Sequence, residues 1–203
     1  MTIDTKDMLN SILASISRID YINPDDIPNI DLYMDQVTTF MDAQLKSSKR
    51  YPEDKILTKT MINNYAKNDL LPAPVKKRYS KEHLLLLIFI YYFKNILSIN
   101  DIQTMLKPIS DKYFHTEGDL NLKDIYEEVF SMEKNQIENM KKDLIRQYEK
   151  AQQTFENEPE EEQEFLKTFS FICTLSFDVY VKKQIIEHLI DSMKKPEDKK
   201  KGK

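Results

Sequence analysis

The sequence predicts an all-α protein, and three observations support that prediction. Only 2 of the 203 residues are glycine, although tight hairpins and phosphate-binding loops need glycine for positive φ angles. Apolar residues make up 40% of the chain and charged residues 32%, which is typical of a folded domain rather than of a disordered chain or a membrane protein. In long segments, apolar side chains also recur every three or four residues, as they do along helices.

The composition also argues against an enzyme. So few glycines leave no Rossmann fingerprint, P-loop or nucleophile elbow. The single cysteine, Cys173, allows neither an intramolecular disulfide nor a cysteine-based zinc site. The three histidines are far apart in the sequence, and we find no catalytic constellation. We therefore expect no catalytic residue, no metal site and no cofactor.

The sequence gives no indication of secretion or of a membrane span. The N-terminus, MTIDTKDML, lacks the basic segment and the long apolar run of a secretory signal. The longest apolar run, Leu84–Phe93, has ten residues, whereas a transmembrane helix needs about 20. We expect a cytoplasmic protein that does not contact a membrane.

Residues 1–30 are expected to form an N-terminal helix and a linker. Thr5 can cap a helix over residues 5–19, with Ile12 and Ile16 on its apolar face. Residues 20–30 contain two prolines and no helical period, which predicts the linker.

Residues 31–108 are expected to form one domain of short helices. Asp31 is the expected cap of the first, over residues 32–45. The apolar stripe of this helix is Tyr33, Val37, Phe40, Met41 and Leu45. After a basic loop over residues 46–55, Thr58 is expected to open a short helix over residues 58–68, as an exposed residue of that helix. Its inward residues are expected to be Met61, Ile62 and Tyr65, and the segment Leu70–Pro74 ends it.

The second half of this domain begins with a short extended piece, Val75–Tyr79. Ser80 is expected to cap a helix over residues 81–95, which is apolar nearly all round and should be the buried centre of the domain. Ser98 and Asp101 form a capping pattern for a helix over residues 99–106. Pro108 follows the end of that helix, and residues 112–120 are expected to form a loop.

Residues 121–193 are expected to form a C-terminal helical hairpin, and residues 194–203 a disordered tail. The two helices of the hairpin cover residues 121–155 and 160–193. The hairpin is expected to pack either within one chain or across a dimer. In the second helix a stripe follows alternating steps of four and three residues, which is heptad spacing. The stripe consists of Phe165, Phe169, Ile172, Ser176, Val179, Lys183, Ile186, Ile190 and Met193. Cys173 is expected to be a small core residue.

A basic segment lies between two acidic ones. Residues 1–45 carry 2 basic and 8 acidic side chains, and residues 95–203 carry 17 and 22. Residues 46–94 carry 11 basic and 4 acidic side chains, a net charge of +7 in a chain of net charge −4. Charge alone leaves two explanations open: a surface that binds a polyanion, or complementary charge that docks this segment on its acidic neighbours.

Three sequence blocks between residues 57 and 106 stand in an order found in a known family. They are LTKTMINNYAKNDLLP (57–72), KRYSKEHLLLLIFI (77–90) and LSINDIQTML (97–106). Together they resemble the winged helix-turn-helix of MerR-type regulators. They resemble more closely an uncharacterised domain-of-unknown-function family of Gram-positive bacteria, which is itself MerR-like. The resemblance implies that the first block is the recognition helix with its turn. It implies that the second block connects the β wing to the following helix, and that the third block is the helix after that. The wing is expected to contain at most a minimal β structure.

The blocks depart from the pattern of that family at several positions. Asn63 and Asn64 stand where an arginine and a second tyrosine are usual, and Asp69 replaces a glycine. Aspartate adopts the left-handed conformation more readily than most residues, so this replacement is tolerable. The wing is short and lacks its glycine pair, and the link between the first two helices is longer than a tight turn.

The resemblance and the charge pattern together define a candidate DNA-binding site. Its members are Thr58, Lys59, Thr60, Asn63, Asn64, Lys67, Lys76, Lys77 and Arg78. Asparagine can pair with two atoms of adenine in the major groove, and cationic side chains can contact phosphates. The alternative is that these asparagines and lysines are ordinary solvated positions. Tyr65 is expected to lie in the core rather than on DNA.

These observations predict a DNA-binding transcriptional regulator whose C-terminal helices serve dimerisation or effector response. The expected partners are double-stranded DNA and a second copy of the chain, bound through those helices. The rival prediction is a protein-interaction module on a helix-turn-helix scaffold that does not bind DNA. Salt distinguishes the two, because binding to DNA weakens steeply with salt whereas binding through apolar helices does not.

Overall fold

The computed structural model describes residues 5–16, 22–116 and 118–194. These residues are mostly helical and form one small two-stranded sheet, which confirms the all-α prediction. The elements in chain order are α1 (Thr5–Ile16), η1 (Pro24–Asp26), β1 (Leu32–Tyr33), α2 (Met34–Gln44), η2 (Lys46–Ser48), α3 (Lys59–Lys67), β2 (Arg78–Tyr79), α4 (Lys81–Phe93), α5 (Ile99–Tyr113), α6 (Leu122–Ser131), α7 (Glu133–Gln152) and α8 (Glu160–Met193). The predicted end of the first helix, residues 17–19, and all of the predicted tail beyond Lys194 lie outside the described residues. None of the described helices is long and apolar enough to cross a membrane.

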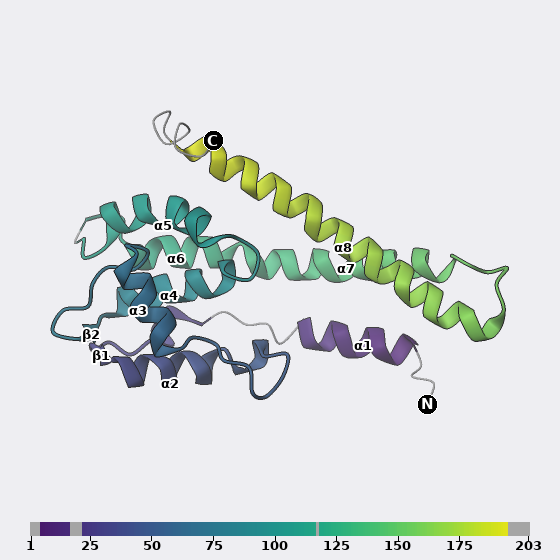
Figure 1. Cartoon of the computed structure of the whole chain (residues 1–203), viewed down its shortest axis with the longest axis horizontal. Coiled ribbons are helices and arrows are strands. Elements are labelled where there is room, and N and C mark those ends of the chain that lie inside the picture. Colours follow the sequence, from purple (N-terminus) through teal and green to yellow (C-terminus); the bar gives the residue numbers. More distant parts are fainter. Residues whose placement is uncertain (1–4, 17–21, 117, 195–203) are drawn as a thin grey trace. The chain divides into compact units, whose positions relative to one another are not determined.

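The described residues divide into two compact units (Figure 1). The larger unit comprises the described residues of 19–131 and 187–203, and the smaller unit comprises those of 1–18 and 132–186. All nine residues of the candidate DNA-binding site therefore belong to the larger unit.

Helix α4 is the centre of the larger unit. Every residue from His83 to Tyr91 is buried, as the apolar sequence of this helix predicts. The helix begins at the predicted cap, where the backbone N–H of Ser80 donates to Nδ1 of His83 at 2.9 Å. Against its far end, the rings of Phe89 and Tyr126 of α6 lie 5.5 Å apart, centroid to centroid.

The segment before β1 is part of this core rather than a simple linker. Ile22, Pro24 and Ile27 are buried, and the hydroxyl of Tyr126 donates to the carbonyl oxygen of Ile22 at 2.8 Å. The prolines exclude a long helix here, as predicted, but Ile22 and Ile27 are still buried, and η1 contacts α6. Residues 20 and 21 of the predicted linker lie outside the described residues.

The start of α2 differs from the prediction. The helix begins at Met34 and its cap is Tyr33, whose backbone N–H donates to Oε1 of Gln36 at 2.9 Å. Asp31 is therefore not the cap, because residues 32 and 33 are drawn into a strand. Tyr33 was expected on the inward stripe, but its side chain is 50% exposed because strand residues alternate between faces. Val37 and Met41 are fully buried, as predicted.

Helix α5 continues to Tyr113, past the predicted end at residue 106. Proline in a helix removes one hydrogen bond and typically costs about 3 kcal/mol, but Pro108 lies inside α5. Packing on both sides of the proline maintains the helix: Leu106 before it is buried and Ile109 after it is half-buried. The predicted loop is correspondingly shorter.

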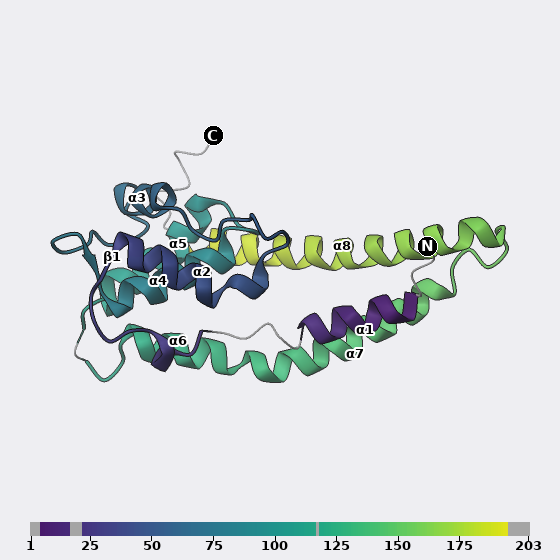
Figure 2. The same cartoon turned by 90° about the horizontal axis from the view of Figure 1, so that it is seen from below.

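The smaller unit is built from α1, α7 and most of α8. α1 lies beside α7 (Figure 2), and their shared core contains Leu9, Leu144, Ala151 and Phe171. The predicted single helix over residues 121–155 is in fact two, α6 and α7, interrupted at Met132. The two units divide at this same residue.

The packing predicted for α8 is wrong over most of its length. Cys173 is exposed rather than a core residue, because α8 faces the rest of the smaller unit through Phe171 and Leu175 instead. The residues of the predicted heptad stripe from Phe165 to Val179 are exposed. Further along the same stripe, Ile190 is buried. Heptad spacing identified a real stripe but not the side of the helix that packs within the chain.

Candidate nucleic-acid interface

Helix α3 has a well-defined beginning. The backbone of Thr58 is extended and its side-chain oxygen accepts a hydrogen bond from the backbone N–H of Met61 at 3.2 Å. Thr58 was expected to be the first residue of the helix, but it is the N-cap, and it satisfies one of the donors left free at a helix start. Thr58 is half-buried, so its first role is structural.

The end of α3 is fixed by a left-handed cap. Asp69 has φ +54°, and the backbone N–H of Leu70 donates to the carbonyl oxygen of Tyr65 at 2.9 Å. A left-handed residue followed by this bond is the Schellman arrangement, which usually uses glycine. The prediction that Asp69 replaces glycine in this conformation is therefore confirmed. From α5, Nε2 of Gln103 donates to the carbonyl oxygen of Asn68 at 2.9 Å and anchors the same end.

Helix α3 presents one apolar face and one polar face. Ile62 and Tyr65 are buried, as predicted, whereas Met61 is partly exposed instead of inward. The outward face holds the remaining candidate residues of this helix, all of them exposed: Lys59, Thr60, Asn63, Asn64 and Lys67. A short, capped helix held by its inner face thus presents two adjacent amides and two lysines to solvent.

A tight turn lies at the same end of the larger unit as α3 in both views (Figures 1 and 2). Strands β1 and β2 pair antiparallel, with Leu32 opposite Tyr79 and Tyr33 opposite Arg78. Just before β2, the backbone N–H of Arg78 donates to the carbonyl oxygen of Val75 at 2.9 Å. The predicted extended piece is therefore not extended throughout, because the chain reverses between these two residues.

The centre of this turn consists of two lysines in a strained conformation. Lys76 has φ +50° and Lys77 has φ +63°, and both side chains are exposed. Two successive positive φ angles are typical of a type I′ turn, where asparagine and glycine are preferred. The left-handed conformation costs an ordinary residue about 1–2 kcal/mol. Strain kept at an exposed position points to a function for the side chains.

Arg78 is held by a residue that the sequence interpretation did not include in the site. Its Nη2 donates to the hydroxyl of Tyr33 at 3.0 Å, and its guanidinium carbon lies 5.1 Å from the centroid of the same ring. Tyr33 therefore orients Arg78 across the small sheet. The pairing could not be inferred from sequence spacing, because the two residues are 45 positions apart.

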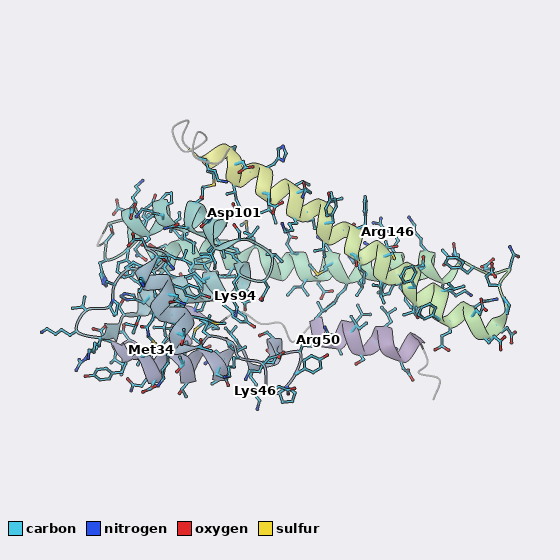
Figure 3. The ribbon with its side chains drawn as sticks, in the orientation of Figure 1. Met34, Lys46, Arg50, Lys94, Asp101 and Arg146 are labelled. Carbon is cyan, nitrogen blue, oxygen red and sulfur yellow. The ribbon has the colours of Figure 1, made fainter. Side chains whose placement is uncertain are left out.

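The structure shows that part of the basic segment docks on an acidic neighbour, which is one of the two explanations that its charge left open, because two of its lysines pair with carboxylates of α2. Lys49 forms an ion pair with Asp42 of α2 at 2.7 Å. Nζ of Lys94 (labelled in Figure 3) donates to the carbonyl oxygen of Ile56 at 2.7 Å. Burial lowers the pKa of the Lys94 ammonium group. These lysines are structural. Lys59 pairs with Asp35 of α2 while both remain exposed. Lys67, Lys76 and Lys77 are exposed.

His83 of α4 and His115, which follows α5 in the chain, form a separate cluster. His83 is 1% exposed, and burial, reinforced by the neighbouring His115, lowers its pKa to about 4. Nδ1 of His115 lies 2.5 Å from Oε2 of Glu82. Among the described residues, no group of three or more His, Cys, Asp and Glu side chains is placed to hold a metal ion.

Comparison with known proteins adds one assignment. The sequence pattern of a family described as a domain of unknown function, DUF1836, matches residues 22–130. That region is more than half of the 203 residues and contains every element of the candidate interface. No curated protein and no solved structure matches the chain. The chain therefore belongs to the DUF1836 family.

Proposed function

We propose that this protein is a DNA-binding transcriptional regulator with a MerR-like winged helix-turn-helix in its larger unit. In this proposal α3 is the recognition helix and the turn at Lys76 and Lys77 is the wing. The observation that carries the proposal is the placement of strained, exposed lysines at the same end of the unit as a capped helix with a polar outer face. The proposal gives the chain no catalytic role.

Each candidate residue has a defined task in this proposal. Asn63 and Asn64 read base edges in the major groove, where an amide can pair with both N6 and N7 of adenine. Thr58 and Thr60 lie at the N-terminal end of α3, the end that approaches base edges in a helix-turn-helix. The five cations contact phosphates and position the helix without reading sequence. They are Lys59, Lys67, Lys76, Lys77 and Arg78.

A charge-matched pair of variants tests this proposal. The first variant carries Lys76→Ala, Lys77→Ala and Arg78→Ala. The control carries Lys142→Ala, Arg146→Ala and Lys150→Ala on α7 (Figure 3 labels Arg146), where all three side chains are exposed. Like the wing variant, it removes two lysines and one arginine. Binding to the protein's own promoter region and to random duplex is measured by fluorescence anisotropy over a salt series.

The wing variant should bind all duplexes more weakly, and its salt slope should be lower by up to about one unit for each lost contact. The control should bind like the wild type. Asn63→Ala or Asn64→Ala should lose roughly 1–3 kcal/mol on the specific site and little on random duplex. Wild-type protein that binds no duplex even at low salt would contradict the proposal.

The second candidate is a protein-interaction module that keeps the helix-turn-helix as a scaffold. The exposed apolar residues of α8 favour it, because soluble monomers rarely display large apolar patches. The same salt series separates the candidates, since an interface of apolar side chains depends little on ionic strength.

A further inference from the structure

The basic loop of residues 46–55 is anchored to the core of the larger unit at both of its ends. On the entry side, the hydroxyl of Ser48 is hydrogen-bonded to the hydroxyl of Tyr91 in α4. Just beyond the exit, Nζ of Lys94 at the end of α4 donates to the carbonyl oxygen of Ile56 at 2.7 Å, and Ile56 is buried. The buried helix α4 therefore holds both ends of this loop in place.

Between the anchors the backbone of the loop folds into a closed turn. Oδ2 of Asp54 accepts hydrogen bonds from the backbone N–H of Arg50 at 3.1 Å and from that of Tyr51 at 2.9 Å. The backbone N–H of Asp54 donates in return to the carbonyl oxygen of Tyr51 at 3.0 Å. At the start of this turn, the guanidinium carbon of Arg50 lies 5.2 Å from the centroid of the Tyr51 ring, a contact that attracts the cation to the ring face. The loop thus presents an oriented, exposed arginine.

Three cations of the basic loop are available to an external anion. Lys46, Arg50 and Lys55 are all exposed. No carboxylate within residues 5–16, 22–116 and 118–194 forms an ion pair with any of the three, whereas the fourth cation of the loop, Lys49, pairs with Asp42 of α2. The positive charge of the loop is therefore only partly neutralised by the chain itself.

The basic loop and the wing lie at opposite ends of α2, and α3 lies between them (Figures 1 and 2). At one end, Tyr33 caps α2 and holds Arg78 of the wing. Beyond the other end lie Lys46 and Arg50 (Figure 3). α2 has 11 residues, which span about 16 Å at about 1.5 Å per residue. The major groove is about 12 Å wide, so cations at the two ends of α2 can reach phosphates on both sides of a groove that holds α3.

The exit of the loop also brings positive charge to the start of α3. Lys55 lines a shallow groove together with Thr39 of α2 and with Thr58, the N-cap of α3. The N-terminal end of a recognition helix is the end that approaches base edges. A cation beside it is therefore close to the DNA backbone when the helix is in the groove.

We propose that the basic loop is a second phosphate-binding element, which contacts the backbone of duplex DNA on the side of α3 opposite the wing. The inference deepens the proposed function and rests on it. Lys46, Arg50 and Lys55 supply the charge, while Tyr91 and Lys94 are positioning residues that hold the loop. The loop positions the protein without reading sequence, as phosphate contacts do. The length of the link between α2 and α3 then has a purpose, because a turn of three or four residues would be enough to join the two helices.

Removal of the three charges tests the inference. The loop variant carries Lys46→Gln, Arg50→Gln and Lys55→Gln. The control carries Lys142→Gln, Arg146→Gln and Lys150→Gln on α7, which are also two lysines and one arginine at exposed positions. Binding of the full-length proteins to random duplex is measured by fluorescence anisotropy over a salt series. Circular dichroism checks that both variants are as helical as the wild type and melt at the same temperature.

The loop variant should bind random duplex at least about tenfold more weakly at low salt, and its salt slope should be lower by up to about one unit for each lost contact. The control should bind like the wild type, and Arg50→Lys should keep the wild-type slope because it keeps the charge. A folded loop variant with the affinity and slope of a DNA-binding wild type would overturn the inference. So would an equal loss in the control, because net charge would then explain the result.

A combined variant tests the side of α3 on which the loop binds. It joins the loop substitutions to Lys76→Ala, Lys77→Ala and Arg78→Ala of the wing. If the two elements contact different phosphates, the reductions in salt slope should add. A combined reduction no larger than that of one element alone would mean that both meet the same phosphates, and would overturn the placement opposite the wing.

The outcomes for this inference and for the proposed function are distinguishable. Wild-type protein that binds no duplex at low salt would overturn the proposed function and this inference with it. Binding that is weakened in the wing variant but not in the loop variant would overturn this inference alone. The reverse pattern would support the basic loop and contradict the assignment of the wing.

Discussion

Helices α4 and α8 show how differently the two units use apolar sequence. From His83 to Tyr91, α4 is buried on every side, because α5, α6 and β2 all contact it. α8 has 34 residues, yet its buried residues are Phe171 and Ile190, and many of its large apolar side chains face solvent. A continuous apolar run is buried where several elements surround it, whereas a long helix that packs along only part of its surface keeps its remaining apolar side chains exposed.

This difference has an energetic meaning. Burying a side chain such as Phe or Ile contributes about 1.5–3 kcal/mol relative to leaving it exposed. The larger unit obtains that stabilisation from its own residues, and the DUF1836 match at residues 22–130 covers most of it. The exposed apolar side chains of α8 do not obtain this stabilisation within the chain.

The largest expected effect compares one isoleucine from each unit. Ile88 of α4 has 0% exposure and Ile185 of α8 has 55%. Ile88→Ala should lower the free energy of unfolding by about 2–5 kcal/mol, because it leaves a cavity in a packed core. Ile185→Ala should lower it by about 0.5 kcal/mol or less. Urea denaturation measures both, and similar effects would contradict the distinction between the units.

The sequence predicted the fold best where the signal was local. Ser80 and Ser98 each cap the helix they were expected to cap, because capping depends on a few neighbouring residues. It failed where distant packing decides. Tyr33 faces outward because β1 pairs with a strand 45 residues away, and α5 passes through Pro108 because both flanks are packed.

The candidate interface was predictable to a similar degree. Helical periodicity was enough to place Asn63 and Asn64 outside and Ile62 inside, and the structure agrees. The positive φ angles of Lys76 and Lys77 could not be inferred, because two lysines are a poor turn signal compared with Asn-Gly. The role of Tyr33 and the Lys59–Asp35 pair needed three-dimensional information.

A second prediction sharpens the comparison through pH. Burial and the neighbouring His115 lower the pKa of His83 to about 4, whereas an unfolded histidine has a pKa near 6.5. Between these values the unfolded state binds more protons, so stability falls as the pH drops from 6.5 toward 4. The full loss is about 3 kcal/mol. The carbonyls of Pro72 and Ala73 and the carboxylate of Asp31 oppose this shift.

Two histidine variants isolate that loss from the titration of carboxylates. His83→Gln should retain more of its stability at pH 4.5 than the wild type does, with urea denaturation at pH 7 as the reference. His188→Gln, at an exposed position in α8, should follow the wild type. Parallel stability curves for His83→Gln and the wild type would show that His83 does not titrate in this window.

A third prediction concerns the surface of the larger unit, which is less optimised than its core. Lys76→Asn with Lys77→Gly supplies residues that adopt positive φ readily, so it should raise the free energy of unfolding by about 1 kcal/mol. It should also weaken DNA binding and lower the salt slope by about two units. Denaturation and anisotropy are measured on the same samples. A more stable protein with unchanged DNA binding would separate the strain from the proposed function.

The smallest expected effect tests the other polar element of that surface, the pair between Lys59 of α3 and Asp35 of α2. Both side chains are exposed, and exposed ion pairs are typically worth about 0–1 kcal/mol. Asp35→Asn should therefore change the free energy of unfolding by less than about 1 kcal/mol. If Lys59 contacts phosphate, the variant should bind DNA about two- to fivefold more tightly at low salt, because the competing carboxylate is gone.

Asp42→Asn is the matched control, since it removes one charge from the same helix beside Lys49, which is largely covered. Equal gains in both variants would mean that net charge, rather than the position of Lys59 on α3, sets the affinity.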